Sequence, residues 1–409
     1  MSKRFGLLGE KLGHSFSPQI HALLADYEYR LIEIAPREVE SFLRNGDFDG
    51  LNVTIPYKKT VLPLCAALSG EAARIGSVNT IIKRNDGSLY GDNTDYYGFS
   101  YMLGKSGAGV RGKKALVLGS GGAAATVRAV LGDAGAGEVV TISRGGPDNY
   151  ENIGKNADAR IIVNATPVGM YPENGASPVR MDIFRECESV LDVVYNPART
   201  ELMLQAQELG VPCVGGLSML AAQAKRACEL FTGGVIADEV IERIERIIGN
   251  EMINIALIGM PGCGKTSVGR RIAEITGREF FDIDELITNK AGKSIERVFA
   301  DDGEAVFRDM ESDILGDISK KQACVIATGG GIVKKPANRR LLRQNSITVF
   351  IDRKLSELPS DGRPLSLSQG VDKLYAERLP LYLQWSDYKI SSGGGVEQTA
   401  RAVLETIGI

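Results

Sequence analysis

The sequence has few features of an exported, membrane-bound or nucleic-acid-binding protein. Its six cysteines form no C-x-x-C pair, which is typical of reduced thiols in the cytoplasm. No run of about 18 apolar residues is present, and the N-terminal apolar patch is too short for a signal peptide. The formal net charge is −3 and there is no long basic run. We therefore expect a cytoplasmic protein that binds neither membranes nor nucleic acid.

The chain is 409 residues long, which predicts two or three domains. Strand patterns alternate with helix patterns along most of it, and this alternation favours α/β domains with parallel sheets. In residues 1–100, helices are expected to start near Pro18, Pro36 and Gly70. Strands are expected in this part at RFGLLG, YRLIEI, LNVTI and VNTIIKR.

A phosphate-binding loop, GMPGCGKT, occupies Gly259–Thr266. It follows the apolar run INIALI and precedes a helix pattern, as the motif G-x-x-x-x-G-K-[ST] requires. The backbone N–H groups of the loop, with Gly259, Gly262 and Gly264, can surround a triphosphate. Lys265 can reach the outer phosphates and Thr266 can ligate Mg²⁺. This half of the chain is therefore predicted to bind ATP and Mg²⁺.

A second glycine-rich loop lies in ALVLGSGGAAAT, Ala115 to Thr126. It matches the dinucleotide-binding pattern G-x-G-x-x-A and is followed by a second strand, EVVTIS. The position that holds a carboxylate in NAD-binding proteins holds Ser143 and Arg144, and a guanidinium favours the 2′-phosphate of NADP. The cofactor-binding residues expected around this loop are Gly119, Gly121, Gly122, Ala123, Ser143 and Arg144.

Small polar residues follow the strands expected in residues 1–100. Such residues suit a hydroxylated, anionic small molecule, although each alone is more often a cap or turn residue. Lys58 stands near them in a segment poor in cations, and it is either functional or a solvated surface lysine. The polar cluster consists of Ser15, Ser17, Asn52, Thr54, Asn79, Thr94 and Asp95.

Residues 1–248 resemble shikimate dehydrogenases. The motifs that carry the resemblance are GEKLGHSFSP, GLNVTIPYK, SVNTI, GDNTD, NATPVGM, DVVYNPARTELM and GLSMLAAQA, in the order of the family. The resemblance implies NADPH-linked reduction of 3-dehydroshikimate to shikimate. It implies that Lys58 is catalytic beside Asp95, and that Gly216 approaches the nicotinamide. The implied substrate-binding residues are Ser15, Ser17, Asn52, Thr54, Asn79, Tyr195 and Gln223.

Residues from about Met252 to Ile409 resemble shikimate kinases. The motifs are the phosphate loop, FFDIDE, DGEAVFRDME, ATGGGIV, GRPL and ERLPLY. The resemblance implies that Asp284, Arg308, Gly330 and Arg378 hold shikimate. It also implies that Asp282 supports Mg²⁺ with Thr266, and that Arg363 of a lid meets the transferring phosphoryl group.

The residue types fit phosphoryl transfer. Lys265, Mg²⁺ and Arg363 would neutralise charge around the phosphates, and Asp284 could accept the proton of the attacking hydroxyl. We expect Asp282 and Asp284 to end a strand with both side chains on one face, because strand side chains repeat every two residues.

The combined prediction is a bifunctional enzyme with a doubly wound fold and a phosphate-loop kinase fold. Residues 1–100 form a substrate domain completed by helices in 217–248, residues 101–216 a Rossmann NADP domain, and residues 252–409 the kinase domain. Two alternative functions stay open: a first half that uses quinate or NAD, and a non-catalytic metabolite sensor. A homodimer through the dehydrogenase half also stays open. The junction has no Pro/Ser-rich spacer, so wide tethered motion is not expected.

Overall fold

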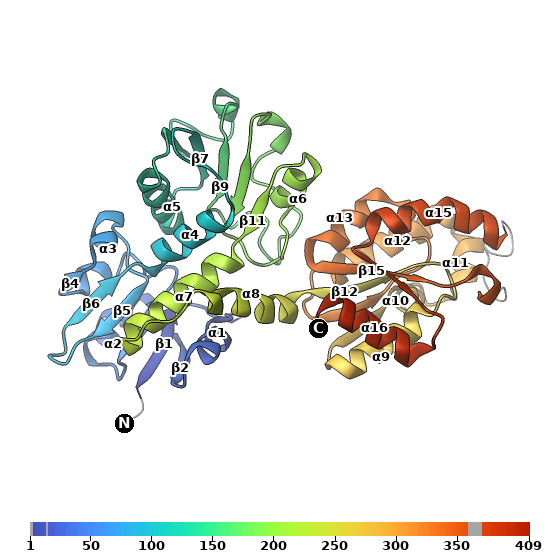
Figure 1. The fold of residues 1–409 in the computed structure, drawn as a ribbon, viewed down its shortest axis with the longest axis horizontal. Coiled ribbons are helices and arrows are strands. Elements are labelled where there is room, and N and C mark those ends of the chain that lie inside the picture. Colours follow the sequence, from blue (N-terminus) through green and yellow to red (C-terminus); the bar gives the residue numbers. More distant parts are fainter. Residues whose placement is uncertain (1–2, 14, 359–369) are drawn as a thin grey trace. The chain divides into compact units, whose positions relative to one another are not determined.

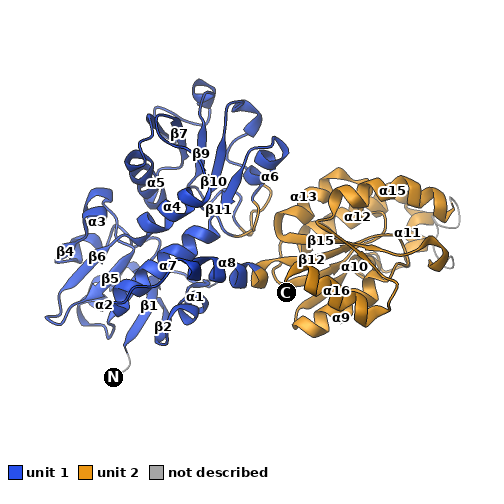
Figure 2. Cartoon of the chain, in the orientation of Figure 1, with its two compact units in different colours: residues 1–170, 176–195, 200–249 blue, residues 171–175, 196–199, 250–409 orange. Residues whose placement is uncertain are grey.

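The computed structural model describes residues 3–13, 15–358 and 370–409. The chain folds into two compact units, drawn in blue and orange in Figure 2. The first comprises residues 1–170, 176–195 and 200–249, and the second comprises 171–175, 196–199 and 250–409. Each unit is built on its own sheet or sheets, so the two are described separately.

The first unit begins with a six-stranded sheet in the order β2-β1-β3-β5-β6-β4. Strand β1 pairs in parallel with β2 and β3, whereas β5 is antiparallel to both β3 and β6. Two short strands, β4 and β6, were not foreseen, because their sequences are brief and β6 enters the polar GDNTD segment. The strands are β1 (Arg4–Gly9), β2 (Glu28–Glu33), β3 (Gly50–Val53), β4 (Ala67–Leu68), β5 (Thr80–Lys83) and β6 (Leu89–Asp92), and the helices are α1 (Ser17–Leu24), α2 (Val39–Asn45) and α3 (Gly70–Ile75).

The second sheet of this unit is entirely parallel, in the order β11-β10-β9-β7-β8. Helices α4 and α7 pack against each other (Figure 1). Gly98 of α4 permits this close approach, because a Cβ there would lie 2.6 Å from the backbone oxygen of Met219 in α7. The strands are β7 (Lys114–Leu118), β8 (Glu138–Ile142), β9 (Ile161–Asn164), β10 (Ser189–Asp192) and β11 (Cys213–Gly215), and the helices are α4 (Thr94–Lys105), α5 (Gly122–Asp133), α6 (Glu201–Glu208), α7 (Leu217–Thr232) and α8 (Glu239–Met252).

The second unit is a five-stranded parallel sheet in the order β13-β14-β12-β15-β16, with helices between consecutive strands. Its central strand β12 is buried throughout, as the apolar run INIALI predicts. The strands are β12 (Asn254–Ile258), β13 (Glu279–Asp282), β14 (Cys324–Ala327), β15 (Ser346–Asp352) and β16 (Tyr388–Ser391), and the helices are α9 (Lys265–Thr276), α10 (Ile283–Ala291), α11 (Ile295–Asp301), α12 (Gly303–Ile318), α13 (Pro336–Asn345), α15 (Val371–Trp385) and α16 (Val396–Ile407).

These sheets confirm the predicted α/β fold class, with a Rossmann-like parallel sheet and a separate phosphate-loop domain. Within the part of the chain that the structure describes, every helix is too short or too polar to span a bilayer. The boundary between the units falls within α8, and β12 begins two residues after that helix ends.

Candidate active sites

A cavity of about 290 Å³ lies in the first unit, and the predicted substrate residues meet in it. They come from β3 and the residues after it, from the residue before β5, from the segment after β10, from the starts of α1 and α4, and from α7. Sequence-distant segments therefore converge on one pocket, as a binding site requires. The predicted residues that line it are Ser15, Ser17, Asn52, Thr54, Lys58, Asn79, Asp95, Ala123, Tyr195, Gly216 and Gln223.

Lys58 and Asp95 form an ion pair in this cavity, with 2.6 Å between Nζ and Oδ2. The lysine follows β3 and the aspartate lies in the first turn of α4. Both side chains are largely shielded, with 20% and 11% of their areas exposed. Lys58 is therefore not a solvated surface lysine. Its ammonium group is held at a fixed place in the cavity.

Ser15 and Ser17 lie together at the start of α1. Their hydroxyl oxygens are 3.1 Å apart, and the backbone N–H of Ser17 donates to Ser15 Oγ at 3.2 Å. The N-cap residue of this helix, Phe16, makes no capping side-chain bond. Two neighbouring hydroxyl groups at a helix start suit a carboxylate.

The dinucleotide loop joins β7 to α5. Gly119 has φ +110°, and a Cβ there would lie 3.0 Å from the backbone oxygen of Ala165, so the tight turn needs glycine. Helix α5 begins at Gly122, and its N-cap Gly121 has no side chain to occupy the first N–H groups. Those groups stay available for a phosphate.

Ser143 and Arg144 follow β8, which is the parallel neighbour of β7. They therefore lie at the carboxyl ends of the strands, where the glycine loop also lies. Arg144 is exposed. Among the described residues it forms no ion pair. An exposed guanidinium without a protein carboxylate suits an anionic group of a ligand.

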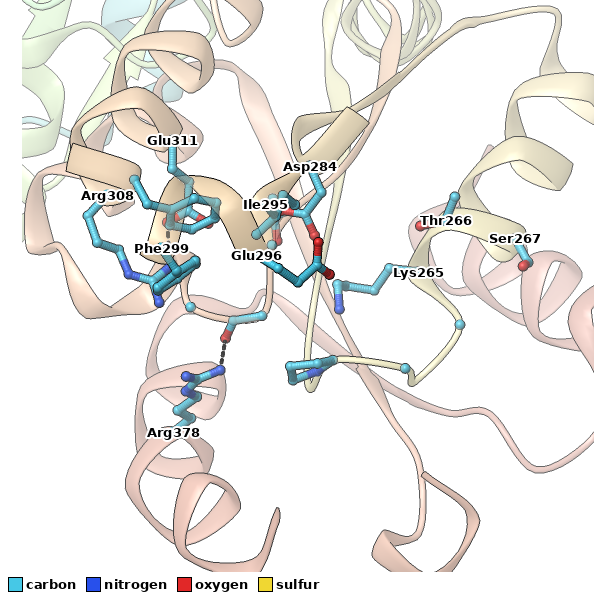
Figure 3. A pocket seen from close by; sticks show the side chains of 18 of the residues that line it. Lys265, Thr266, Ser267, Asp284, Ile295, Glu296, Phe299, Arg308, Glu311 and Arg378 are labelled. Atoms are coloured by element: carbon cyan, nitrogen blue, oxygen red, sulfur yellow. Dashed lines mark hydrogen bonds and ion pairs between the residues drawn. The ribbon is translucent and has the colours of Figure 1, made fainter. Parts of the chain in front are cut away.

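A larger cavity of about 540 Å³ lies in the second unit. Figure 3 shows Thr266 and Ser267 toward one end and Arg308 and Arg378 toward the other. The predicted residues that line it are Gly262, Gly264, Lys265, Thr266, Asp284, Arg308, Gly330 and Arg378, and Arg353 joins them. The predicted Arg363, with Gly362 beside it, lies outside the described residues.

The phosphate loop has the backbone that its glycines allow. Gly259, Gly262 and Gly264 have φ of +146°, +80° and +100°. A Cβ at Gly259 would lie 2.5 Å from the backbone oxygen of Ile351. Lys265 Nζ donates to the backbone oxygens of Gly259 and Met260, at 2.9 Å each. Lys265 is thus held against the phosphate loop by two carbonyl groups of that loop.

Asp282 and Asp284 do not share one face of a strand, so that prediction was wrong. Strand β13 ends at Asp282, and Asp282 is the N-cap of α10, where its Oδ1 accepts from the backbone N–H of Asp284. The capping side chain turns the chain into a helix, which breaks the two-residue repeat. Asp284 still lines the cavity, and Asp282 Oδ2 accepts from Thr266 Oγ1 at 2.6 Å.

Two buried arginines face the far end of this cavity. Arg308 Nη1 lies 2.9 Å from Oε2 of Glu311, which is fully buried. Arg378 donates from Nη1 to the backbone oxygen of Gly330 at 2.9 Å. Its Nε and Nη2 are buried and, among the described residues, have no partner. Buried N–H groups without partners fit an anionic ligand.

Sequence reasoning missed Glu311, Gly329 and Gly331. Glu311 follows Arg308 by three residues on a helix, the spacing at which two side chains meet, and this signal could have found it. Burial raises the pKa of Glu311 to about 7, against the lowering effect of Arg308. A Cβ at Gly329 would lie 2.5 Å from Glu311 Oε1, and one at Gly331 would collide with the Arg308 guanidinium. These two glycines leave room for the charged side chains.

Comparisons with known proteins give a family match for each part of the chain. The family model of the shikimate dehydrogenase substrate binding domain matches residues 7–81, and that of shikimate kinase matches residues 261–408. A shikimate dehydrogenase (NADP(+)) of Clostridium beijerinckii is 36% identical over an alignment of 267 residues, and the match covers 60% of this chain and 98% of the relative.

Solved structures give the same result for the first part of the chain. A chorismate mutase/shikimate 5-dehydrogenase fusion protein from Clostridium acetobutylicum has a TM-score of 0.58 at 35% identity and covers 61% of this chain and 97% of its own. Shikimate 5-dehydrogenase from Thermus thermophilus, in complex with NADP(H) and shikimate, has a TM-score of 0.55 at 33% identity and covers 60% of this chain and 99% of its own. The chain therefore belongs to the shikimate dehydrogenase family, carries a shikimate kinase domain in residues 261–408, and is an enzyme of both kinds.

Proposed function

We propose that this enzyme reduces 3-dehydroshikimate to shikimate with NADPH and then phosphorylates shikimate to shikimate 3-phosphate with ATP. The observation that carries the first reaction is the Lys58–Asp95 pair inside a cavity of hydroxyl and amide side chains. The second reaction rests on a phosphate loop and two buried arginines around one cavity. The product of the first reaction is the substrate of the second.

In the first cavity, NADPH would supply a hydride to the substrate carbonyl carbon. Lys58 then stabilises the negative charge that develops on the oxygen and donates a proton to it. Asp95 holds the ammonium group in place through the 2.6 Å ion pair. Ser15 and Ser17 bind the carboxylate without competing for that proton, and Asn52, Thr54, Asn79 and Gln223 bind hydroxyls.

The glycine loop and Arg144 support NADP as the cofactor of the first site. The loop has the tight turn and the free N–H groups that a pyrophosphate needs. Arg144 follows β8, beside the strand that carries the glycine loop, which supports a contact with the 2′-phosphate of NADP, and the similar dehydrogenases carry NADP(+) in their names. We propose that Gly216 and Tyr195, which line the cavity, lie near the nicotinamide.

In the second cavity, ATP would supply the phosphoryl group. Asp284 accepts the proton of the attacking hydroxyl, and Arg308 and Arg378 hold the shikimate carboxylate. Thr266 and Asp282 offer a hydroxyl and a carboxylate 2.6 Å apart, which are oxygen ligands that Mg²⁺ prefers. Arg363 is proposed to contact the transferring phosphoryl group.

We assign residues 1–100 with 217–248 to substrate binding, 101–216 to NADP binding and 252–409 to the kinase. Packing of α7 against α1, and of Phe231 of α7 against Phe5 of β1, supports the return of residues 217–248 to the first domain. We also propose a cytoplasmic location, on the cysteine pattern of the sequence, and a homodimer through the dehydrogenase half.

A coupled assay tests the function. The purified chain is given 3-dehydroshikimate, NADPH and ATP with Mg²⁺, and NADPH loss and ADP formation are followed separately. We expect both signals, with ADP formation dependent on the first reaction. Parallel reactions with NADH and with quinate plus NADP⁺ test the two nearer alternatives. No turnover in either half from folded protein would instead support a metabolite sensor.

A further inference from the structure

Thr80 stands behind the wall of the dehydrogenase cavity. It is the first residue of β5, is fully buried, and is not one of the residues that line the cavity. Its hydroxyl nevertheless contacts both predicted hydroxyl-binding amides. Asn52 Nδ2 donates to Thr80 Oγ1 at 3.2 Å, and Thr80 Oγ1 donates to Asn79 Oδ1 at 3.2 Å.

The surrounding bonds fix which end of each amide faces the substrate. The backbone N–H of Thr94 can only donate, and it lies 2.7 Å from Asn79, so the atom that it meets is the carbonyl Oδ1. Asn79 Nδ2 is then the free end, and among the described residues no hydrogen bond engages it. The backbone N–H of Thr94 therefore determines the orientation of the Asn79 amide.

Asn52 is fixed from two sides. Tyr29 donates its hydroxyl proton to Asn52 Oδ1 at 2.8 Å, and Thr80 accepts from Asn52 Nδ2. The hydroxyl of Thr80 has one proton and lies near Asn79 Oδ1 at 3.2 Å and Thr94 Oγ1 at 3.1 Å, so with the proton on that side its lone pairs remain for Asn52. The second proton of Asn52 Nδ2 is therefore left for a ligand. Both amides would then present N–H donors to the cavity.

We propose that Thr80 is a positioning residue of the dehydrogenase site, whose hydroxyl holds Asn52 and Asn79 so that both donate N–H groups to hydroxyl oxygens of the substrate. This inference rests on the proposed function, because it assigns a polyhydroxylated substrate to the same cavity. Thr80 itself does not touch the substrate. Its effect should be limited to the binding and alignment of the hydroxylated molecule.

The test compares Thr80→Val with Thr80→Ser in the full chain. Valine keeps the shape and loses the hydroxyl, whereas serine keeps the hydroxyl. With shikimate and NADP⁺, Thr80→Val should lower kcat/KM for shikimate about 10- to 100-fold, as loss of a buried hydrogen-bond hub does. Thr80→Ser should recover most of it. The KM for NADP⁺ should change less than about twofold, because no bond of Thr80 reaches the cofactor loop.

Thermal unfolding of the dehydrogenase unit shows whether each variant is folded, because phosphorylation of added shikimate reports only on the separate kinase unit. If Thr80→Val is poorly folded, Tyr29→Phe takes its place, since it releases Asn52 from the other side. Its matched control is Tyr97→Phe, because the Tyr97 hydroxyl bonds Asp238 and Lys225, which do not line the cavity. We expect Tyr29→Phe, and not Tyr97→Phe, to raise the KM for shikimate.

The outcomes distinguish a failure of the proposed function from a failure of the positioning role of Thr80. A wild-type chain that does not oxidise shikimate removes the proposed function itself. An active wild type with an unchanged Thr80→Val, or with Thr80→Ser as impaired as Thr80→Val, overturns the positioning role alone. Equal losses toward shikimate and NADP⁺ would also overturn it, because they indicate general damage to the fold.

Discussion

Lys58 Nζ and Asp95 Oδ2 lie 2.6 Å apart, although 37 positions separate the two residues in the sequence. The pair joins the end of β3 to the first turn of α4, and both side chains line one cavity. In the second unit, Lys265 is held by two carbonyls of its own loop. Each half thus has a separate lysine in a separate cavity.

The two activities should be separable by single substitutions. Lys58→Ala removes the proton donor of the first site, so we expect kcat for dehydroshikimate reduction to fall about 10²- to 10⁴-fold. Phosphorylation of shikimate by this variant should stay within about twofold of wild type, since no residue of the kinase cavity changes. Lys265→Ala should have the reverse effect. Steady-state assays of each half check this, and loss of both activities in either folded variant would contradict it.

Arg144 should set the preference for NADPH. A charge-assisted contact to the 2′-phosphate contributes about 1.5–3 kcal/mol, so Arg144→Ala should weaken NADPH binding roughly 10- to 150-fold. NADH lacks that phosphate and should be affected little. Arg180→Ala is a matched control, because Arg180 is an exposed arginine that pairs with Asp182. Equal losses for NADPH and NADH would show that Arg144 does not contact the phosphate.

Glu311 should make the kinase unit less stable as pH rises. Burial raises its pKa from 4.5 to about 7, so between these values the folded state binds a proton that the unfolded state has released. Stability is then lost as pH rises through this window and is constant above it. The charged groups that face it are Arg308, Asp284 and Arg378.

Glu311→Gln removes the titrating proton and keeps the shape. Relative to wild type, we expect the unfolding temperature of the variant to rise by roughly 2 to 6 °C more at pH 8 than at pH 5. Thermal unfolding of the kinase unit at four pH values measures this. A difference that is flat with pH, or that grows toward acid, would mean that Glu311 is ionised throughout.

The chain should be divisible between Gly249 and Asn250. Asn250 and Met252 bond within the second unit, since Asn250 Nδ2 donates to the backbone oxygen of Gly408 and Met252 O accepts from the N–H of Ala323. Met252 is also almost fully buried. We expect pieces 1–249 and 250–409 to be soluble and to keep their activities within about threefold, because each has its own core. A cut after Met252 should give a less stable kinase piece. Inactivity of the 250–409 piece would contradict the division.

Arg363 should act on the transition state of phosphoryl transfer. As a cation that meets charge on the moving group, its loss should lower kcat about 10²- to 10⁴-fold, with a smaller change in the KM for ATP. Arg353→Ala is the comparison, because Arg353 lines the cavity from the end of β15. If kcat survives in Arg363→Ala and falls in Arg353→Ala, then Arg353 has the role assigned to Arg363.

Much of this molecule could be predicted from local sequence. Short-range rules predict the two glycine loops, the strands before them and the helices after them. The positive φ angles of Gly119 and Gly259 are local backbone conformations that glycine adopts easily, so the motif alone indicates them. Strand β6 was missed because a four-residue strand in a polar segment is stabilised by its pairing with β5 and not by its own pattern. The Asp282–Asp284 expectation failed because one capping side chain ended the strand.

The sequence by itself determined the fold class, the two nucleotide loops and the family resemblance of each half, because short contiguous motifs specify all three. Only the tertiary structure decided that Glu311 is buried beside Arg308, and that Thr80 joins Asn52 to Asn79 behind the cavity wall. A hydrogen bond or a shifted pKa depends on distance and burial between side chains from different elements. Those quantities exist only once the sheets have brought the elements together.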